Sequence, residues 1–539
     1  MMERMNSTGQ TGGNPYLAAV HSTLPRLLAL FDSNPISPTM GLGDRLYWSW
    51  KLKDFANGTF QGAINGLARL YVHDLLPVHM SRASILTRID RMFMAVNRIR
   101  RRNGSLEEAF PHESSFCVTA LVAYDLLVAV RLLRQRVPEQ TLQRWLSVIA
   151  PLIRFLETAE ETHGVISNHL LTAVAALEHW ADISEQGASR RGRVLLDRVL
   201  ANASPEGWMR EYEGADPGYQ SLALVYLADI HAIRPGYALG ETIQGCLHFL
   251  SHFVHPDGTF GGLYGSRNTR FFSPGGIRTL AMEFDEARAI CETMEPSIQK
   301  QIVVGLVSTD ESNLIPMFNS YCMAAQAWVQ DTPERNNHTQ AAYRLPCHRE
   351  LAAITHFPQA GLWIRRGTSG SYTIVSTHKG GVHYHYPANG PGQLNAGVAL
   401  QHASTGSWAT SQAYDPECTV EFDETGITIQ AAVRPVSIMY PTPGRFLVLR
   451  MLNLTVMRNH RLGNLVKNIL ATLLITRKRQ QVGTLTRRLR FAGDELLVED
   501  RLSNLLPGYE QVETGTFSSL HMASQGYWQR SDDCNDSTT

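Results

Sequence analysis

The sequence predicts a multidomain α + β protein in which an N-terminal (α/α) toroid is followed by a C-terminal antiparallel β-sandwich. The chain has 539 residues, which exceeds the roughly 250–300 residues at which a single hydrophobic core stops growing. The spacing of apolar residues changes from helical to alternating near residue 350. A glycine-led pattern also recurs through the helical part.

The first part of the chain carries apolar residues at helical spacing. Clear examples are 116–133, 142–156 and 220–232, with Gly, Pro or Asn-Gly between such segments. After Leu351 the apolar residues alternate in short runs rich in Thr, Val, Ile and Tyr, which is typical of an antiparallel sandwich. We therefore place the boundary within 331–349. The predicted units are an N-terminal extension (1–40), the toroid (41–335), the sandwich (350–525) and a disordered tail (526–539).

A weak internal repeat supports the toroid. A polar residue followed by glycine precedes a helical segment at Gly58, Gly104, Gly164, Gly207 and Gly258. The intervals are the length of two helices with their loops, so the repeat indicates either an open solenoid or a closed toroid. Polar and aromatic residues follow these glycines. A toroid would gather them at one end around a single cleft, and we therefore favour it.

Composition and charge give few indications of a partner. Lysine plus arginine equals aspartate plus glutamate at 49 each, so the global charge indicates neither nucleic acid nor membrane. The seven cysteines include no CxxC pair, which favours reduced thiols over a zinc site. The apolar stretch 464–476 is interrupted by Lys467 and is shorter than the roughly 20 residues that span a bilayer. The N-terminus has no signal-peptide pattern, so we expect a cytoplasmic protein, or a periplasmic one if the start is truncated.

Four segments are rich in side chains that could carry chemistry. Three follow the repeat glycines, at 164–171, 208–220 and 261–270, and the fourth is the strand-like segment 378–386. At strand spacing, alternate residues of the fourth segment share a face. The candidate side chains are Asn168 and His169 in the first segment, Trp208, Arg210, Glu211 and Tyr219 in the second, Tyr264, Arg267 and Asn268 in the third, and His383 and His385 in the fourth.

The order of these motifs resembles the heparinase II/III and alginate-lyase-like superfamily of polysaccharide lyases. The resemblance rests on an Asn-His pair at 168–169, a Pro-x-Tyr at 217–219 and a histidine-bearing strand after them. The segments 57–63, 206–222 and 261–272 are similar to members associated with bacterial surface-polysaccharide clusters. The likeness covers most of residues 40–400. One departure is 385–392, where a carboxylate commonly follows the histidine and this chain reads HYPANGPG.

The resemblance implies β-elimination on a polysaccharide that contains uronic acid. Asn168, assisted by His169 or Arg267, would stabilise the charge that develops at the uronate. Tyr219 would act as acid, and also as base when both protons lie on one face of the sugar. His383 or His385 would be the base for the opposite geometry. No cofactor is implied; a structural divalent metal in the sandwich, with His378 as a third histidine, stays open.

The implied partner is an acidic polysaccharide or oligosaccharide, with neither nucleic acid nor membrane, and the oligomeric state stays open. The residues expected to bind it are Trp48, Trp50, Glu113, Trp208, Arg210, Glu211, Tyr264, Arg267 and Asn268.

Simpler roles and two other functions stay open. Asn168 could be a helix cap, His169 a structural histidine and Tyr219 a core residue. A glycoside hydrolase would need two carboxylates roughly 5–10 Å apart, and the candidates are Glu107, Glu108, Glu113, Glu211, Glu213 and Asp216. A carbohydrate-binding component of polysaccharide export would retain the aromatic and basic residues without catalysis. The basic run from Arg458 to Arg490 is attributed mainly to exposed strands, with contact to an anionic polymer as the alternative.

Overall fold

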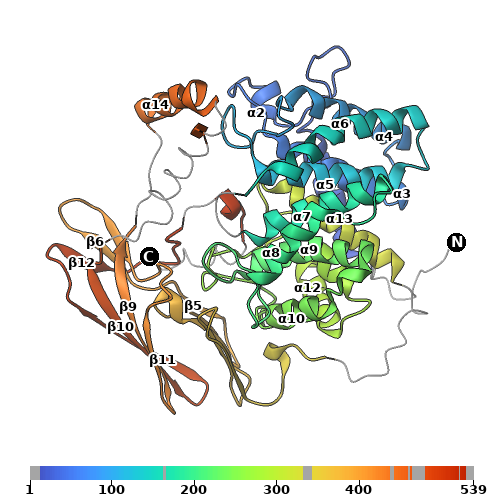
Figure 1. The fold of residues 1–539 in the computed structure, drawn as a ribbon. Helices are drawn as coiled ribbons and strands as arrows, with labels where there is room; N and C mark the ends of the chain where they lie inside the picture. Colours follow the sequence, from blue (N-terminus) through green and yellow to red (C-terminus); the bar gives the residue numbers. More distant parts are fainter. Residues whose placement is uncertain are drawn as a thin grey trace.

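The computed structural model describes residues 13–161, 166–331, 343–436, 442–458, 462–463, 480–520 and 523–529. A helical part lies beside a β part (Figure 1). The change of period predicted near residue 350 is confirmed, because the last long helix of the helical part ends at Gln330 and the first strand begins at Ala353. The prediction of a helical domain followed by antiparallel β-structure is therefore correct.

The helical part contains thirteen α-helices within the described residues. They are α1 (Pro15–Leu28), α2 (Arg45–Trp48), α3 (Ile64–Val72), α4 (Arg82–Ile99), α5 (Phe116–Leu133), α6 (Glu139–Thr158), α7 (Ser167–Ile183), α8 (Arg190–Ala201), α9 (Pro217–Ile233), α10 (Gly240–Ser251), α11 (Pro274–Leu280), α12 (Asp285–Gln299) and α13 (Leu314–Gln330).

Six of these helices contact one another in a closed series. In this series α3 packs on α5, α5 on α7, α7 on α9, α9 on α11 and α11 on α13. The series closes because α13 packs on α3. The helices α1, α4, α6, α8, α10 and α12 pack against this inner set. Inner and outer helices thus alternate along the chain, as two-helix repeats predict.

The burial pattern follows from this arrangement. α5 has neighbours on several sides and buries nearly all of its side chains between Val118 and Val130. The outer helix α4 instead buries a single stripe that includes Ile85, Ile89 and Val96, as an amphipathic helix on a core does. Among the described helices, only α5 is long and apolar enough to cross a membrane, and most of it lies inside the protein core.

Three of the repeat glycines stand at turns before the polar loops. Gly104, Gly207 and Gly258 have φ values of +93°, +90° and +84°. Residues other than glycine rarely adopt this backbone conformation. At Gly207 a Cβ would also lie 2.2 Å from the carbonyl oxygen of Gly245. Gly164, the third glycine of the repeat, lies outside the described residues.

In the part of the chain that the structure describes, the β part consists of two antiparallel sheets. The first has the order β1-β2-β3-β4-β5; the second has the order β11-β10-β9-β7-β6-β12, with β8 paired to β9. Their strands are β1 (Ala353–Phe357), β2 (Leu362–Arg366), β3 (Tyr372–Ser376), β4 (Val382–Tyr386), β5 (Gln393–Asn395), β6 (Ala399–His402), β7 (Trp408–Thr410), β8 (Thr419–Phe422), β9 (Gly426–Pro435), β10 (Gly483–Ala492), β11 (Glu495–Ser503) and β12 (Tyr509–Val512).

Apolar side chains of the two sheets share a small core. Trp363 and Val375 of the first sheet pack with Ile427, Ile429 and Leu489 of the second. A further helix, α14 (Pro443–Leu454), belongs to the connection between β9 and β10. It lies away from the sheets, near α2 (Figure 1).

The first sheet docks on the helical part through buried polar contacts. The Tyr372 hydroxyl donates to the carbonyl oxygen of His252 at 2.7 Å. The Lys379 ammonium donates to the carbonyl oxygens of Leu263 and Gly265, at 2.6 and 3.0 Å, and to Oδ1 of Asn268. Lys379 follows β3 in the short helix η5 (Thr377–Lys379) and is almost fully buried. Burial lowers the pKa of Lys379 to about 7, and the charge of Asp216 acts in the opposite direction.

Two predicted boundaries need correction. The expected N-terminal extension contains α1, which packs on α12 and α13 and is therefore part of the helical domain. The expected disordered tail begins with residues 526–529, which contact the helical part: Asp310 N donates to Gly526 O at 2.8 Å and Trp528 N donates to Ser308 O at 3.0 Å. The rest of the expected tail, 530–539, lies outside the described residues.

We expect Lys379→Met to lower the free energy of unfolding by about 2–4 kcal/mol, because it leaves three buried acceptors without their donor. Urea denaturation measures this change. Lys300→Met, at an exposed position, is the matched control and should have little effect. Equal stability of the two variants would show that Lys379 does not hold the two parts together.

Candidate functional site

Three polar loops meet at one end of the helical ring. The Ser167 hydroxyl at the start of α7 donates to the carbonyl oxygen of Arg210 at 2.7 Å, and Ile166 forms a β-bridge with Glu211. The third loop joins them because Ser266 N donates to the carbonyl oxygen of Ala215 at 2.8 Å. The segments that follow the repeat glycines are thus brought together, as a closed ring requires.

Asp216 fixes the geometry of two of these loops. It is the N-cap of α9: Oδ1 accepts from Tyr219 N at 3.2 Å, and Pro217 occupies the first helical position. Its other oxygen accepts from Arg267 N at 2.9 Å, and the Thr269 hydroxyl also donates to Asp216. Burial raises the pKa of Asp216, although these hydrogen bonds favour its ionised form. One buried carboxyl group therefore positions both Tyr219 and Arg267.

Asn168 faces a buried glutamate. Its Nδ2 donates to Oε2 of Glu211 at 3.3 Å, and both side chains are almost fully buried. Asn168 lies inside the first turn of α7, and the N-cap position is occupied by Ile166. The interpretation of Asn168 as a helix cap is therefore wrong.

Glu211 has an unusual environment. Burial raises its pKa to about 8, and the charges of Asp216 and Glu161 act in the same direction, whereas His169 and Arg267 oppose the shift. A carboxyl group with such a pKa changes protonation close to neutral pH. Groups of this kind serve as general acids and bases.

Tyr219 and Arg267 complete the cluster. The Tyr219 ring packs edge-on against Phe271, with centroids 5.6 Å apart. Burial and the charge of Glu211 raise the pKa of Tyr219, while Arg267 lowers it. The Arg267 guanidinium lies 3.9 Å above the Tyr212 ring, and its Nε is buried without a hydrogen-bond partner among the described residues. This guanidinium can therefore still bind an anion.

His169 lies on the other side of Glu211. Its Nδ1 is 2.9 Å from Oε2 of Glu161, and the Cys117 sulfur contacts the same ring. Burial disfavours the imidazolium, but Cys117 and Glu161 favour it, and together they raise the pKa of His169 well above its ordinary value. The carboxylate of Glu161 thus favours the charged form of His169.

The strand histidines do not join this cluster. Alternation along β4 places Tyr384 toward the helical part, where its hydroxyl accepts from Leu263 N at 3.1 Å. His383 and His385 occupy the opposite face: Arg487 of the second sheet lowers the pKa of His383 beyond the effect of burial, and Nδ1 of His385 is 2.8 Å from the Thr373 hydroxyl. The two faces were predicted correctly, but the expectation that a histidine faces the cleft is wrong.

Several predicted binding residues have structural partners instead. The indole N–H of Trp208 donates to Glu206 at 2.9 Å, and Arg210 Nε donates to the carbonyl oxygen of Tyr212 at 2.9 Å. Tyr264 is buried between the two parts of the molecule, with its hydroxyl 2.8 Å from Nε2 of His255. Asn268 has a φ of +58° and bonds Lys379, Gln412 and Ser518.

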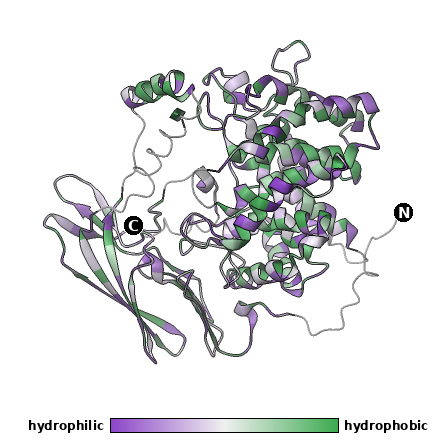
Figure 2. Ribbon diagram, viewed as in Figure 1, coloured by the Kyte–Doolittle hydropathy of each residue, from purple (hydrophilic) through white to green (hydrophobic). Residues whose placement is uncertain are grey.

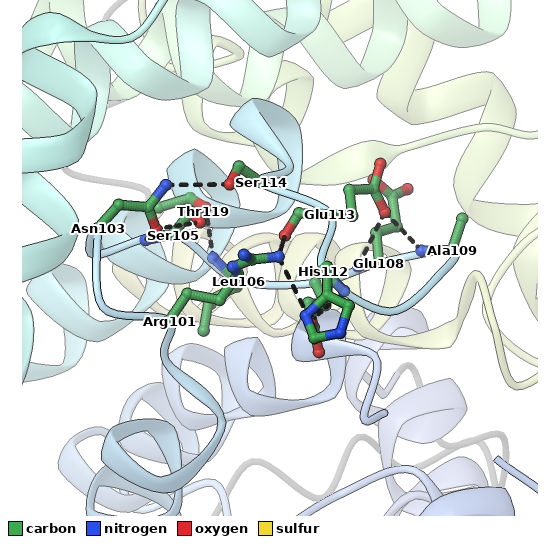
Figure 3. Close-up of polar contacts among 11 residues, drawn as sticks. Arg101, Asn103, Ser105, Leu106, Glu108, Ala109, His112, Glu113, Ser114 and Thr119 are labelled. Atoms are coloured by element: carbon green, nitrogen blue, oxygen red, sulfur yellow. Dashed lines mark hydrogen bonds and ion pairs between the residues drawn. The ribbon is translucent and has the colours of Figure 1, made fainter. Parts of the chain in front are cut away.

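Glu113 stabilises its own loop (Figure 3). Its carboxylate accepts from the backbone amides of Glu108 and Ala109 at 3.2 and 2.8 Å, and its carbonyl oxygen accepts from Arg101 at 3.1 Å. Trp48 donates its indole N–H to Leu30 O at 2.8 Å, while Trp50 is exposed. These hydrogen bonds of Trp48 and Glu113 join residues within 30–113.

Sequence reasoning did not identify Cys117, Glu161 or Lys379 as neighbours of the cluster. Asp216 had a visible signal, because an aspartate directly before Pro217 is typical of a helix N-terminus. Another neighbour of the helical loops is His378, whose Nδ1 lies 3.3 Å from the Tyr414 hydroxyl; that hydroxyl in turn donates to Glu213 O at 3.3 Å. Within the described ranges, no three His, Cys, Asp or Glu side chains are grouped so that they could hold a metal ion.

Comparison with known proteins gives similarity of fold. The sequence matches no protein-family model and no curated protein. The structure is similar to heparinase III (TM-score 0.48, 11% identity, covering 93% of this chain and 73% of that chain) and to a Streptomyces coelicolor A3 chondroitin AC lyase in complex with chondroitin sulphate (0.47, 10%, 79% and 68%). It is also similar to a Paenibacillus xanthan lyase (0.43, 11%, 78% and 45%), so this chain spans less than half of that protein. These neighbours are polysaccharide lyases; at such values the likeness does not decide the activity of this chain.

We expect the pH dependence of stability to reveal Glu211. Its pKa in the folded protein is raised, so the stability gained from its protonated form is present below the unfolded pKa and is lost as the pH rises through about 8. Wild type should lose about 3–5 kcal/mol relative to Glu211→Gln between about pH 5 and about pH 9.

Urea denaturation at both pH values measures this difference. Glu213→Gln, at an exposed position two residues away, is the control and should show no such change. A difference between wild type and Glu211→Gln that does not vary with pH would contradict the proposed environment of Glu211.

Proposed function

We propose that this protein is a polysaccharide lyase that cleaves a uronic-acid-containing polysaccharide by β-elimination. In this proposal the closed ring of helices is an (α/α) toroid and the two packed sheets are a β-sandwich. The observation that carries it is the cluster of buried Asn168 and Glu211 with partly buried Tyr219 and Arg267 at one end of the ring. This cluster combines anion-binding donors with two groups that can exchange protons.

The first requirement of the reaction is to stabilise charge at the uronate. The C5 proton lies next to a carboxylate and is weakly acidic while that carboxylate is a free anion. The Arg267 guanidinium and the Asn168 amide are donors that can bind it, and the His169 imidazolium adds positive charge nearby. Fixed donors of this kind stabilise developing charge most strongly where water is excluded.

The second requirement is a base, and we assign this role to Glu211. Its carboxyl group lies within hydrogen-bonding distance of Asn168, so it is next to the group that would hold the uronate carboxylate. His169 is less suitable because its Nδ1 pairs with Glu161 at 2.9 Å, which favours the protonated ring. His383 and His385 are unsuitable because they face the second sheet.

The third requirement is an acid, and Tyr219 fits it. Burial and Glu211 keep its phenol protonated. In the reaction Glu211 takes the C5 proton, the C4–C5 double bond forms, and the C4–O4 bond breaks. Tyr219 gives its proton to O4, since a sugar alkoxide is a stronger base than a phenolate. Proton transfer from Glu211 to Tyr219 through solvent then restores both groups.

The arrangement of carboxylates disfavours a glycoside hydrolase. That mechanism needs two carboxyl groups free to act on either side of the bond. Both carboxylate oxygens of Asp216 accept hydrogen bonds from the start of α9 and from the loop 261–270. The carboxylate of Glu113 accepts hydrogen bonds from backbone amides of its own loop. Glu107 accepts from His112 N at 2.6 Å and pairs with Arg101. Glu108 accepts from the Ser115 hydroxyl at 2.8 Å. Of the six candidate carboxyl groups, the exposed Glu213 is therefore the one that could still act beside Glu211.

We expect Tyr219→Phe to lower kcat by about 10²–10⁴-fold, the usual contribution of a general acid. The assay is ultraviolet absorbance of the unsaturated product on a panel of uronate polymers. Tyr509→Phe, on β12, is the matched control and should retain wild-type turnover. New reducing ends without absorbance would identify a hydrolase, and binding without turnover a carbohydrate-binding protein.

We expect kcat/KM of wild type to rise with pH and to level off above about 8, because the base must be ionised in the free enzyme. Glu211→Gln should lose about 10²–10⁴-fold in kcat and lose this rise. Glu213→Gln should retain both. A rate that instead falls as the pH rises through this range would show that protonated Glu211 is the active form and would exclude it as the base.

A further inference from the structure

α14 exposes apolar side chains around most of its circumference, including Phe446 and Leu449, which are 51% and 37% exposed. Leu447, Val448, Met451 and Leu454 follow one another at helical spacing, and they are 61%, 59%, 60% and 44% exposed. The opposite side of the helix carries Asn453, which is buried. Figure 2 shows α14 as a largely hydrophobic ribbon at the edge of the molecule. We call the four exposed residues the apolar stripe.

The position of α14 is held by a salt bridge to the helical part. Arg450 Nη1 lies 2.9 Å from Oδ1 of Asp54. Asp54 follows a segment with three exposed apolar residues. These are Leu46, Trp50 and Leu52, which are 49%, 65% and 74% exposed. Exposed apolar side chains thus occur on α14 and in the segment that this salt bridge ties to it. Large exposed apolar surface marks an interaction site.

The charge around the apolar stripe is positive. Arg445 and Arg458, on either side of it, are both exposed. The described segment 442–458 contains no acidic residue, and its basic residues are Arg445, Arg450 and Arg458. Arg450 pairs with Asp54 of the helical part.

We infer that the apolar stripe of α14, flanked by Arg445 and Arg458, binds the surface of an anionic lipid bilayer. Apolar side chains on a surface helix enter the boundary between headgroups and acyl chains, and flanking basic residues are attracted to anionic lipids. Trp50 fits the same surface, because tryptophan is enriched at membrane interfaces. A polysaccharide would not cover such aliphatic side chains.

This inference changes one expectation from the sequence. Equal numbers of acidic and basic residues indicated no membrane partner, and the apolar stretch 464–476 is too short to span a bilayer. Binding of a helix to a membrane surface needs neither a net positive protein nor a span. It depends on local charge and on exposed apolar area.

The test is cosedimentation of the full chain with vesicles of phosphatidylcholine alone or with added phosphatidylglycerol. Wild type should bind the anionic vesicles at least about tenfold more strongly, and salt should weaken that binding. The double variant Leu447→Glu, Met451→Glu should bind at least about tenfold more weakly, since it places two negative charges on the face of α14 that would enter the bilayer. Arg445→Glu with Arg458→Glu should reduce the preference for anionic vesicles.

The control is Val78→Glu with Leu351→Glu, which adds the same charge at exposed apolar positions outside α14 and should bind as wild type does. Failure of wild type to bind vesicles, equal binding of neutral and anionic vesicles, or unchanged binding of the stripe variant would each overturn the inference. A second copy of this chain could cover the apolar stripe instead, and sedimentation velocity tests this. A wild-type dimer that the Leu447→Glu, Met451→Glu variant dissociates, together with no vesicle binding, would overturn the inference and assign the surface to a second copy.

Discussion

The candidate site depends on the hydrogen bonds of one buried carboxyl group. Asp216 caps α9 through Tyr219 N and holds the loop 261–270 through Arg267 N and the Thr269 hydroxyl. Without it, the start of α9 and this loop would lose the contacts that set their separation. The spacing between the backbones of Tyr219 and Arg267 is therefore set by Asp216, both of whose oxygens already accept hydrogen bonds.

The β part supports the same loop from the opposite side. Lys379 donates three hydrogen bonds into residues 263–268, and Tyr384 contacts Leu263 N. The face of β4 that meets the helical part is thus used for docking, and this explains why His383 and His385 lie toward the second sheet. Asn268 has the same structural role, since its side chain joins Lys379 to Gln412 and Ser518.

The sequence predicted those features that follow from local periodicity. The helical spacing, the strand alternation and the turn glycines identified the helical part, the β part and the loops that meet at one end of the ring. Periodicity of two assigns His383 and Tyr384 to opposite faces, but it does not say which face meets another domain. For the same reason the burial of Glu211 was not predictable: its surroundings come from 161–169 and 261–270, which are distant in sequence. Asp216 was the exception, because its signal is local.

Burial links the stability of this cluster to its proposed chemistry. Excluding water raises the pKa of Glu211 and of Tyr219, and it leaves Nε of Arg267 without a partner. Each of these states costs folding free energy, and each is useful only if an anionic substrate enters. A bound carboxylate would satisfy Arg267 and strengthen the field that favours charge at the uronate. Packing alone would favour an apolar residue in place of Glu211, since burying an ionisable group costs free energy. The buried Glu211 beside the partly buried Tyr219 and Arg267 is the arrangement that the catalysis we propose needs.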